Sequence, residues 1–331
     1  MTREGARLTD SPFLASLDSR DRSLWRIVAT VGGGLAGAVA VGLFVGGLAL
    51  LVCALVLAPA VGGLRGGVGA LMSGDGPPLA IALGAMAVAV STNLPLALVF
   101  VLIAAAIGRR RISVYFTAAP RFRWRLLLSG LLLSFVVIGP MVVVGQLLDP
   151  HAPRPPLLSL SPAPLGRTGY ALASFLLLIP AAAAEEMVFR GWLLRQTAAF
   201  VRNPAVLLVL NGVIFSAVHV DFAPDAFLTR ALMGAGFAYM TLRLGGIEFS
   251  TGAHAANNIL IVLLIQPLSL TPTPSGGFTL DSLLEDVFLA VAYVAMTEIT
   301  ARWPPLRRWS GADAGASSPS QAGPATIWSG S

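Results

Sequence analysis

Residues 27–64 read IVATVGGGLAGAVAVGLFVGGLALLVCALVLAPAVGGL, a stretch of 38 residues without one charged side chain. A helix needs about 20 apolar residues to cross the hydrocarbon core of a bilayer, so this stretch is long for one span and short for a hairpin of two. Further apolar runs follow along the chain, separated by charged or Pro/Gly-rich segments. The pattern predicts an all-α, polytopic transmembrane bundle of about eight helices. These lie at residues 27–64, 79–107, 126–148, 170–187, 205–220, 226–242, 247–265 and 283–301.

The composition excludes an ordinary soluble protein. Of the 331 residues, 56% are hydrophobic and only 11% are charged, whereas soluble domains carry about 25% charged residues. So few charges cannot cover a water-facing surface, and the lipid bilayer is the expected surrounding. The formal net charge is +6, but the basic residues stand between apolar runs, which is typical of topology signals rather than of nucleic-acid binding.

The basic residues also predict the orientation. With eight spans, one face of the bundle holds both termini and most of the arginines. That face carries Arg20, Arg22, Arg26, Arg109, Arg110, Arg111, Arg121, Arg123, Arg125, Arg195, Arg202, Arg243, Arg302, Arg307 and Arg308. The opposite face carries Arg65, Arg154, Arg167 and Arg230. Because positively charged loops stay inside, we expect both termini to be cytoplasmic.

Lysine is absent, and alanine, glycine, valine, leucine and proline are abundant. This usage suggests a GC-rich bacterial genome, so we expect an integral protein of a bacterial plasma membrane. The single cysteine, Cys53, lies in an apolar run and excludes a disulfide framework and a CxxC metal site.

Four regions are expected along the chain. They are a cytoplasmic N-terminal segment at 1–26, accessory transmembrane helices with loops at 27–169, a catalytic-type transmembrane core at 170–301 and a disordered, low-complexity C-terminal tail at 302–331. We find no internal repeat of the kind that many transporters contain.

Glu185, Glu186 and Arg190 lie within or beside an apolar span. A charged residue at the centre of a span costs about 3 kcal/mol on insertion scales, so each needs a reason. Glu186 and Arg190 are four residues apart and can pair on one helix face. Glu185 then points in another direction, toward a cavity. Alternatively, both glutamates simply mark the cytoplasmic end of the span.

Two histidines lie in later spans. His219 follows Phe215 by one turn, and His254 precedes Asn258 by one turn. Each has a structural alternative: His219 could be a satisfied histidine near a helix end, and His254 with Asn258 could form hydrogen bonds between helices.

Together these groups indicate hydrolysis inside a lipid-shielded cavity. A glutamate could take a proton from water as a general base, one histidine could share that task, and the second histidine with Asn258 could stabilise an oxyanion. Alternatively, Glu185, His219 and His254 could ligate a zinc ion that acidifies the water. A proton relay in a transporter uses the same residue types, and a non-catalytic membrane scaffold could use them for packing alone.

The order of these residues resembles the three motifs of the CAAX prenyl protease and bacteriocin-processing (CPBP) family of intramembrane proteases. The resemblance covers residues 170–267. The matching motifs are Glu185-Glu186-x-x-x-Arg190, Phe215-x-x-x-His219 and His254-x-x-x-Asn258.

This resemblance implies an all-helical membrane fold and an endopeptidase that cleaves a membrane-associated peptide or protein. It implies that Glu185 is the general base, that His219 helps to activate water, and that His254 and Asn258 bind the water or the oxyanion. Glu186 and Arg190 take a supporting electrostatic role. Family members include both metalloproteases and glutamate-type proteases, and here we favour a metal-free site over zinc. The prenylated substrate does not carry over to a bacterial protein.

One feature of the predicted topology opposes this site. Counting along the spans puts Glu185 near the cytoplasmic end of its helix and His219 near the opposite end of the next helix. A shared water requires these two side chains to lie within about 6 Å of each other. Short, tilted or staggered helices, or different span boundaries, could bring them together.

Overall fold

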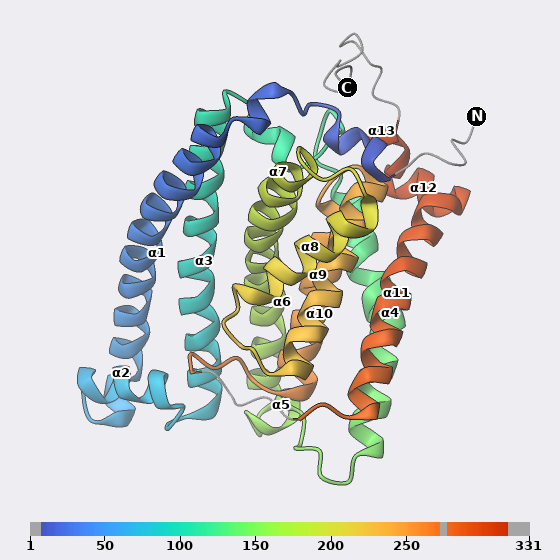
Figure 1. Ribbon diagram of the computed structural model, residues 1–331. Coiled ribbons are helices and arrows are strands. Elements are labelled where there is room, and N and C mark those ends of the chain that lie inside the picture. The colour runs from blue at the N-terminus through green and yellow to red at the C-terminus, as the bar shows by residue number, and fades with distance from the viewer. Residues whose placement is uncertain (1–7, 272–276, 317–331) are drawn as a thin grey trace.

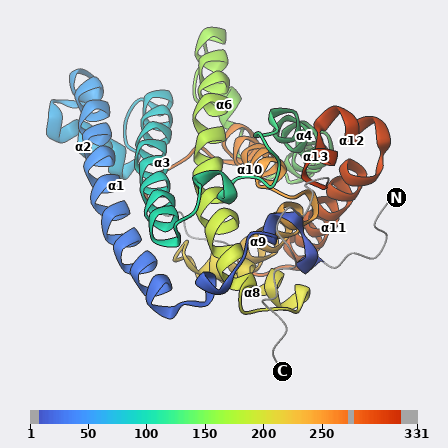
Figure 2. The same cartoon turned by 90° about the horizontal axis from the view of Figure 1, so that it is seen from above.

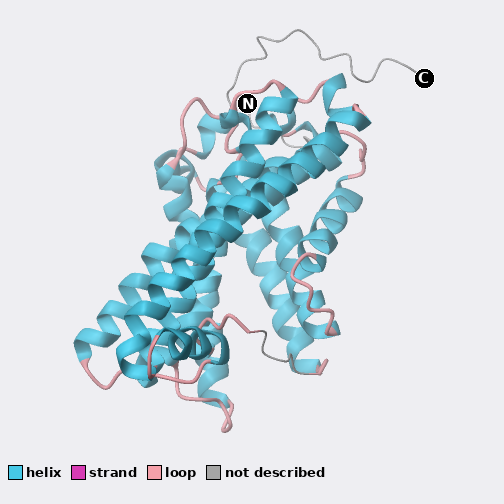
Figure 3. Ribbon diagram, turned by 90° about the vertical axis from the view of Figure 1, so that its left-hand side faces the viewer, coloured by secondary structure: helices cyan, strands magenta, loops and turns pink. Residues whose placement is uncertain are grey.

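The computed structural model describes residues 8–271 and 277–316. Over these residues the chain is helical and has no β-strand, and its only β-type pairing is an isolated bridge between Thr117 and Gly246. Figure 3 shows the helices running roughly side by side through the molecule. The predicted all-α bundle is therefore confirmed.

Each of the eight predicted spans corresponds to one long helix (Figure 1). These are α1 (Leu24–Val61), α3 (Pro78–Gly108), α4 (Trp124–Leu148), α6 (Pro164–Glu186), α8 (Pro204–Ala217), α9 (Pro224–Leu244), α10 (Glu248–Leu260) and α11 (Leu280–Arg302). The predicted span at 27–64 thus corresponds to one 38-residue helix, Leu24–Val61, rather than to a hairpin, and Gly62 ends it in the left-handed region at φ 79°.

Five helical stretches in the described residues are long and apolar enough to cross a membrane. They are Leu24–Val61, Pro78–Gly108, Trp124–Leu148, Pro164–Ala198 and Glu248–Ile265. The fourth stretch is longer than predicted, because α6 continues through a π-helical turn, η5 (Met187–Leu193), into α7 (Leu194–Ala198).

Short elements connect the long helices. They are the 3₁₀ turns η1 (Leu8–Asp10), η2 (Pro12–Leu14), η3 (Ser19–Arg22) and η4 (Ile112–Tyr115), the helices α2 (Leu64–Ser73), α5 (Pro156–Ser159), α12 (Pro304–Ser310) and α13 (Ala312–Ala316), and a second π-helical turn, η6 (Ile261–Ile265).

The predicted disordered tail is wrong for its first part. Residues 304–310 and 312–316 are helical, and the physical reason is packing: Ser310 and Ala312 are buried, and Ala312 belongs to a hydrophobic cluster with Leu126 and Met296. The remainder of the predicted tail, 317–331, lies outside the described residues.

α10 lies at the centre of the bundle and packs against α4, α6 and α9. Every residue of α10 except Asn258 is buried. Since protein rather than lipid surrounds it, this helix can carry polar residues such as Glu248, His254 and Asn257 inside the bundle. α1 packs on α3, and α3 packs on α6, so the first two long helices stand to one side of this centre (Figure 2).

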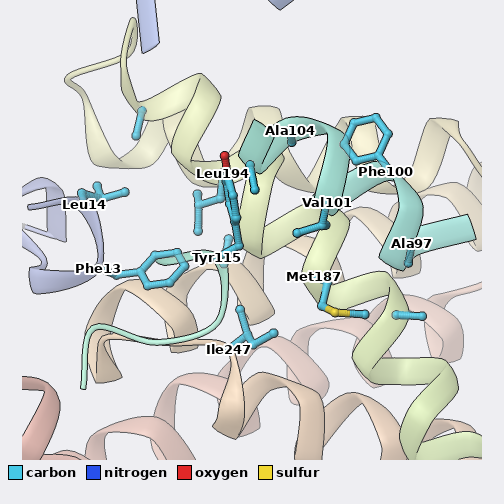
Figure 4. Packing of buried hydrophobic residues seen from close by; sticks show 14 of the residues in the cluster. Phe13, Leu14, Ala97, Phe100, Val101, Ala104, Tyr115, Met187, Leu194 and Ile247 are labelled. Atoms are coloured by element: carbon cyan, nitrogen blue, oxygen red, sulfur yellow. The ribbon is translucent and has the colours of Figure 1, made fainter. Parts of the chain in front are cut away.

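The N-terminal turns η1 and η2 pack against α9 at the end of the bundle where α13 also lies. Phe13 and Leu14 of η2 are buried in a hydrophobic cluster with Phe100 of α3 and Leu194 of α7 (Figure 4). Met187, two residues after Glu185, belongs to the same cluster. This packing fixes the helix segment that carries the glutamate pair.

Candidate active site

Glu185 and His219 come together because of helix lengths that simple counting missed. The helical stretch that begins with α6 does not stop at Glu186 but continues through η5 and α7 to Ala198, so Glu185 lies 13 residues, or about 20 Å, from that end. α8 then starts at Pro204 and ends at Ala217, after the same rise of about 20 Å. His219 therefore arrives at the depth of Glu185, and the expectation that the two lie at opposite ends is wrong.

Two glycines let α8 lie close to α9. A Cβ atom on Gly212 would stand 2.2 Å from the carbonyl oxygen of Ala231, and one on Gly234 would stand 3.0 Å from Cβ of Phe215. Only glycine permits this approach. The close packing sets the position of Phe215, and with it that of His219 one turn later.

Three side chains from three helices meet at one carboxylate oxygen. Oε2 of Glu185 lies 4.0 Å from Nε2 of His219 and 3.7 Å from Nε2 of His254. Both distances exceed a direct hydrogen bond. The Oε2 atom is buried and has no hydrogen-bond partner among the described residues. The arrangement leaves a position where one small molecule, such as water, can contact all three atoms.

Hydrogen bonds at Nδ1 fix which edge of each imidazole ring points at Glu185. Nδ1 of His219 lies 2.7 Å from the carbonyl oxygen of Phe215. A carbonyl only accepts, so this nitrogen carries the proton and, in the neutral ring, Nε2 presents a lone pair. Nδ1 of His254 lies 3.0 Å from Oε1 of Glu186. A carboxylate of Glu186 orients this ring in the same way, with the Nδ1–H donated to Oε1.

Glu186 and Arg190 form a buried ion pair beside Nδ1 of His254. Nη1 of Arg190 lies 3.0 Å from Oε1 of Glu186, and both side chains are inaccessible to solvent. The predicted i,i+4 pairing, with Glu185 turned elsewhere, is therefore confirmed.

Aromatic rings enclose this pair. The guanidinium of Arg190 lies 4.3 Å from the ring centroid of Phe215 and 5.1 Å from that of Phe237, and its Nη2 donates to the carbonyl of Gly234 at 3.1 Å. The ring of His254 stacks on Phe237 at 4.9 Å. Phe215 thus serves as packing, and the rings hold the charged groups in fixed positions.

A partly open cavity of about 610 Å³ leads to Glu185 and His219. Its walls come from α1, α3, η5 and α8 and are mostly apolar. At its rim, Leu35 and Val218 are half-exposed. Asn93 of α3 is the other polar residue in the lining.

Some features of this site were not predicted from the sequence, and one predicted site residue has no described contact with Glu185 or His219. Asn93 stands in an apolar span, a signal we overlooked by considering mainly ionisable groups. The π-helical turn η5, directly after the glutamates, is a geometry often found at functional sites and has no clear sequence signal. Asn258 lies one turn after His254 and is partly exposed, but no described contact joins its amide to Glu185 or His219.

Within the described residues, no group of three or more His, Cys, Asp or Glu side chains is arranged to hold a metal ion. The zinc alternative of Glu185, His219 and His254 stays a prediction.

Comparison with known proteins agrees with this geometry. Residues 167–260 match the family model described as type II CAAX prenyl endopeptidase Rce1-like. The chain contains an Rce1-like domain. This domain includes all the candidate site residues except Asn93, which lies on α3. The predicted resemblance to the CPBP family is confirmed over this region.

One curated relative is the uncharacterized protein YyaK of Bacillus subtilis (strain 168), which is 29% identical over 164 residues. The match covers 47% of this chain and 53% of that protein, so it spans about half of each. No solved structure matches the chain significantly.

Proposed function

We propose that this protein is an intramembrane endopeptidase that hydrolyses a peptide bond of a membrane-associated substrate. The observation that carries the proposal is the convergence of Glu185, His219 and His254 at one buried carboxylate oxygen, at 4.0 and 3.7 Å. A water molecule there donates one proton to Glu185, and its oxygen attacks the scissile carbonyl. His219, with its proton held on Nδ1, accepts the second hydrogen bond of the water and orients it.

The oxyanion formed by this attack needs hydrogen-bond donors. His254 lies between the carboxylates of Glu185 and Glu186, and in this mechanism it acts as an imidazolium with a proton on each ring nitrogen. Its Nε2–H then donates to the oxyanion, and Asn258 assists once the substrate is bound. Glu185 returns its proton to the leaving amine, so that water, carbonyl and amine balance without another reactant.

The cavity supports a substrate that approaches from the lipid. Its apolar walls accept hydrophobic side chains, and a peptide there leaves water for a low-dielectric site in which the charges of Glu185 and His254 act strongly. Asn93 lies across the cavity from the domain and offers an amide to the substrate backbone.

The test compares new protein termini in membranes of cells that produce the wild-type protein or Glu185→Ala at matched abundance. Glu285→Ala, which removes an exposed carboxylate of α11 away from the site, is the matched control. We expect termini that appear with wild type and with the control but disappear with Glu185→Ala. Identical termini in all three, with every variant properly inserted, would contradict the peptidase proposal and favour a scaffold or transporter.

A further inference from the structure

A second cavity lies away from the candidate active site, where α4 begins and α12 ends. It encloses about 400 Å³ and is lined by Arg123, Trp124, Arg125, Arg308, Trp309, Ser310 and Gly311. Two of its arginines and both tryptophans are exposed: Trp124 is 71% and Trp309 43% accessible. The cavity therefore combines free cationic groups with aromatic side chains at the surface of the bundle.

The charge of this cavity is not neutralised by the protein. Arg123 is buried and paired with Glu248 at 2.8 Å, and Arg307 next to the cavity pairs with Asp313 at 2.7 Å. Arg125 and Arg308 have no acidic partner among the described residues, and Arg308 donates only to the carbonyl of Pro304. Two positive charges thus remain available to a ligand.

The backbone adds to this field. The N-cap side chain of α4 makes no capping hydrogen bond, although the backbone N–H of Arg123 donates to Oε1 of Glu248 at 3.3 Å. The first N–H groups of a helix have no acceptor within it. These groups, with the positive end of the helix dipole, favour an anion beside Trp124 and Arg125.

The aromatic residues indicate which anion. Trp124 packs edge-on to Phe122 at 4.6 Å, yet most of its surface is accessible. Trp303, at the junction of α11 and α12, is 56% accessible as well. Tryptophan with such exposure is typical of the headgroup level of a bilayer, where the ring contacts both acyl chain and water. A soluble phosphate would make no use of these rings.

We propose that the cavity between the start of α4 and the end of α12 binds the headgroup of an anionic phospholipid. Arg125 and Arg308 contact the phosphate, and Trp124 and Trp309 contact the glycerol and the first carbons of the chains. The site lies outside the Rce1-like domain and does not depend on the proposed peptidase activity. It attaches α12 and the start of α4 to one leaflet.

The experiment measures lipid binding to the purified full-length protein in detergent by native mass spectrometry. The probes are dioleoylphosphatidylglycerol, dioleoylphosphatidylcholine and glycerol phosphate without chains. We expect phosphatidylglycerol to bind at least about tenfold more tightly than phosphatidylcholine, and glycerol phosphate not to displace it at equal concentration.

The variant Arg125→Gln/Arg308→Gln is expected to weaken phosphatidylglycerol binding about tenfold, while Arg125→Lys/Arg308→Lys retains most of it. The matched control is Arg109→Gln/Arg111→Gln, which removes two exposed arginines after α3 and is expected to change the affinity less than about twofold. An equal loss in the control, equal binding of the two lipids, or displacement by glycerol phosphate would each overturn the proposal.

Discussion

Glu185 and Glu186 are neighbours in the chain, but the helix turns them toward different surroundings. Glu186 is fully buried against Arg190 and His254, whereas the Glu185 side chain is 26% accessible and faces the cavity. The same residue type thus serves two purposes. One carboxylate holds the structure of the site, and the other is available for chemistry.

This difference predicts opposite effects of two matching substitutions. Glu186→Gln leaves Arg190 buried without its charge partner and is expected to lower the free energy of unfolding by about 3–5 kcal/mol. Glu185→Gln removes no described hydrogen bond of Oε2 and is expected to cost less than about 1 kcal/mol, while cleavage falls by about 10²–10⁴-fold. Thermal unfolding in detergent measures the first effect and substrate cleavage the second. Equal destabilisation by both would contradict the assigned roles.

The donors around Glu185 also bear on metal dependence. Because they are not arranged as a metal-binding set in the described residues, we expect cleavage to persist after treatment with EDTA or 1,10-phenanthroline. The measurement is the rate of substrate cleavage before and after chelation. Loss of activity that added zinc restores would assign Glu185, His219 and His254 as ligands instead.

Among the helices, the α8–α9 pair determines where His219 lies. Gly212→Ala would place a methyl group 2.2 Å from the carbonyl oxygen of Ala231 and force the two helices apart. We expect about 1–3 kcal/mol of destabilisation from this overpacking and a loss of cleavage of about tenfold or more, since small displacements of catalytic groups are costly. Gly33→Ala on α1, where a Cβ meets no atom within 4 Å, is the control: it should leave cleavage unchanged and stabilise the helix by about 0.5–1 kcal/mol. Unchanged cleavage by the Gly212→Ala variant would show that the spacing between α8 and α9 does not determine the geometry of the site.

The elements show what the sequence could and could not predict. All eight long helices follow from apolar runs of sufficient length, and the pairing of Glu186 with Arg190 follows from a spacing of four residues. The approach of Glu185 and His219 did not follow, because it depends on how far α6 continues past its charges and on how short α8 is. Asn93 and the cavity were missed because they depend on the packing of α1 and α3 beside the domain.

For the molecule as a whole, the two described ends of the chain lie at the same end of the bundle, where α13 contacts η2 (Figure 1). Together with the arginine distribution, this predicts that both termini are cytoplasmic. Reporter fusions at each terminus should report the cytoplasm, and a reporter inserted after Gly74, between α2 and α3, should report the opposite side. Termini on different sides would require an odd number of crossings and would refute the eight-span topology.

The short α8 helix has a mechanical consequence for the surrounding lipid. The tip of the α8–α9 hairpin carries Val220 and Phe222, which are 76% and 65% accessible, and it turns back after only about 20 Å. A typical hydrocarbon core is about 30 Å thick, so α8 is about 10 Å shorter than the core that it is predicted to cross. Such hydrophobic mismatch favours a locally thinner bilayer beside the hairpin. We therefore expect a thinned membrane next to Glu185, and an activity that changes with the acyl-chain length of the host lipids.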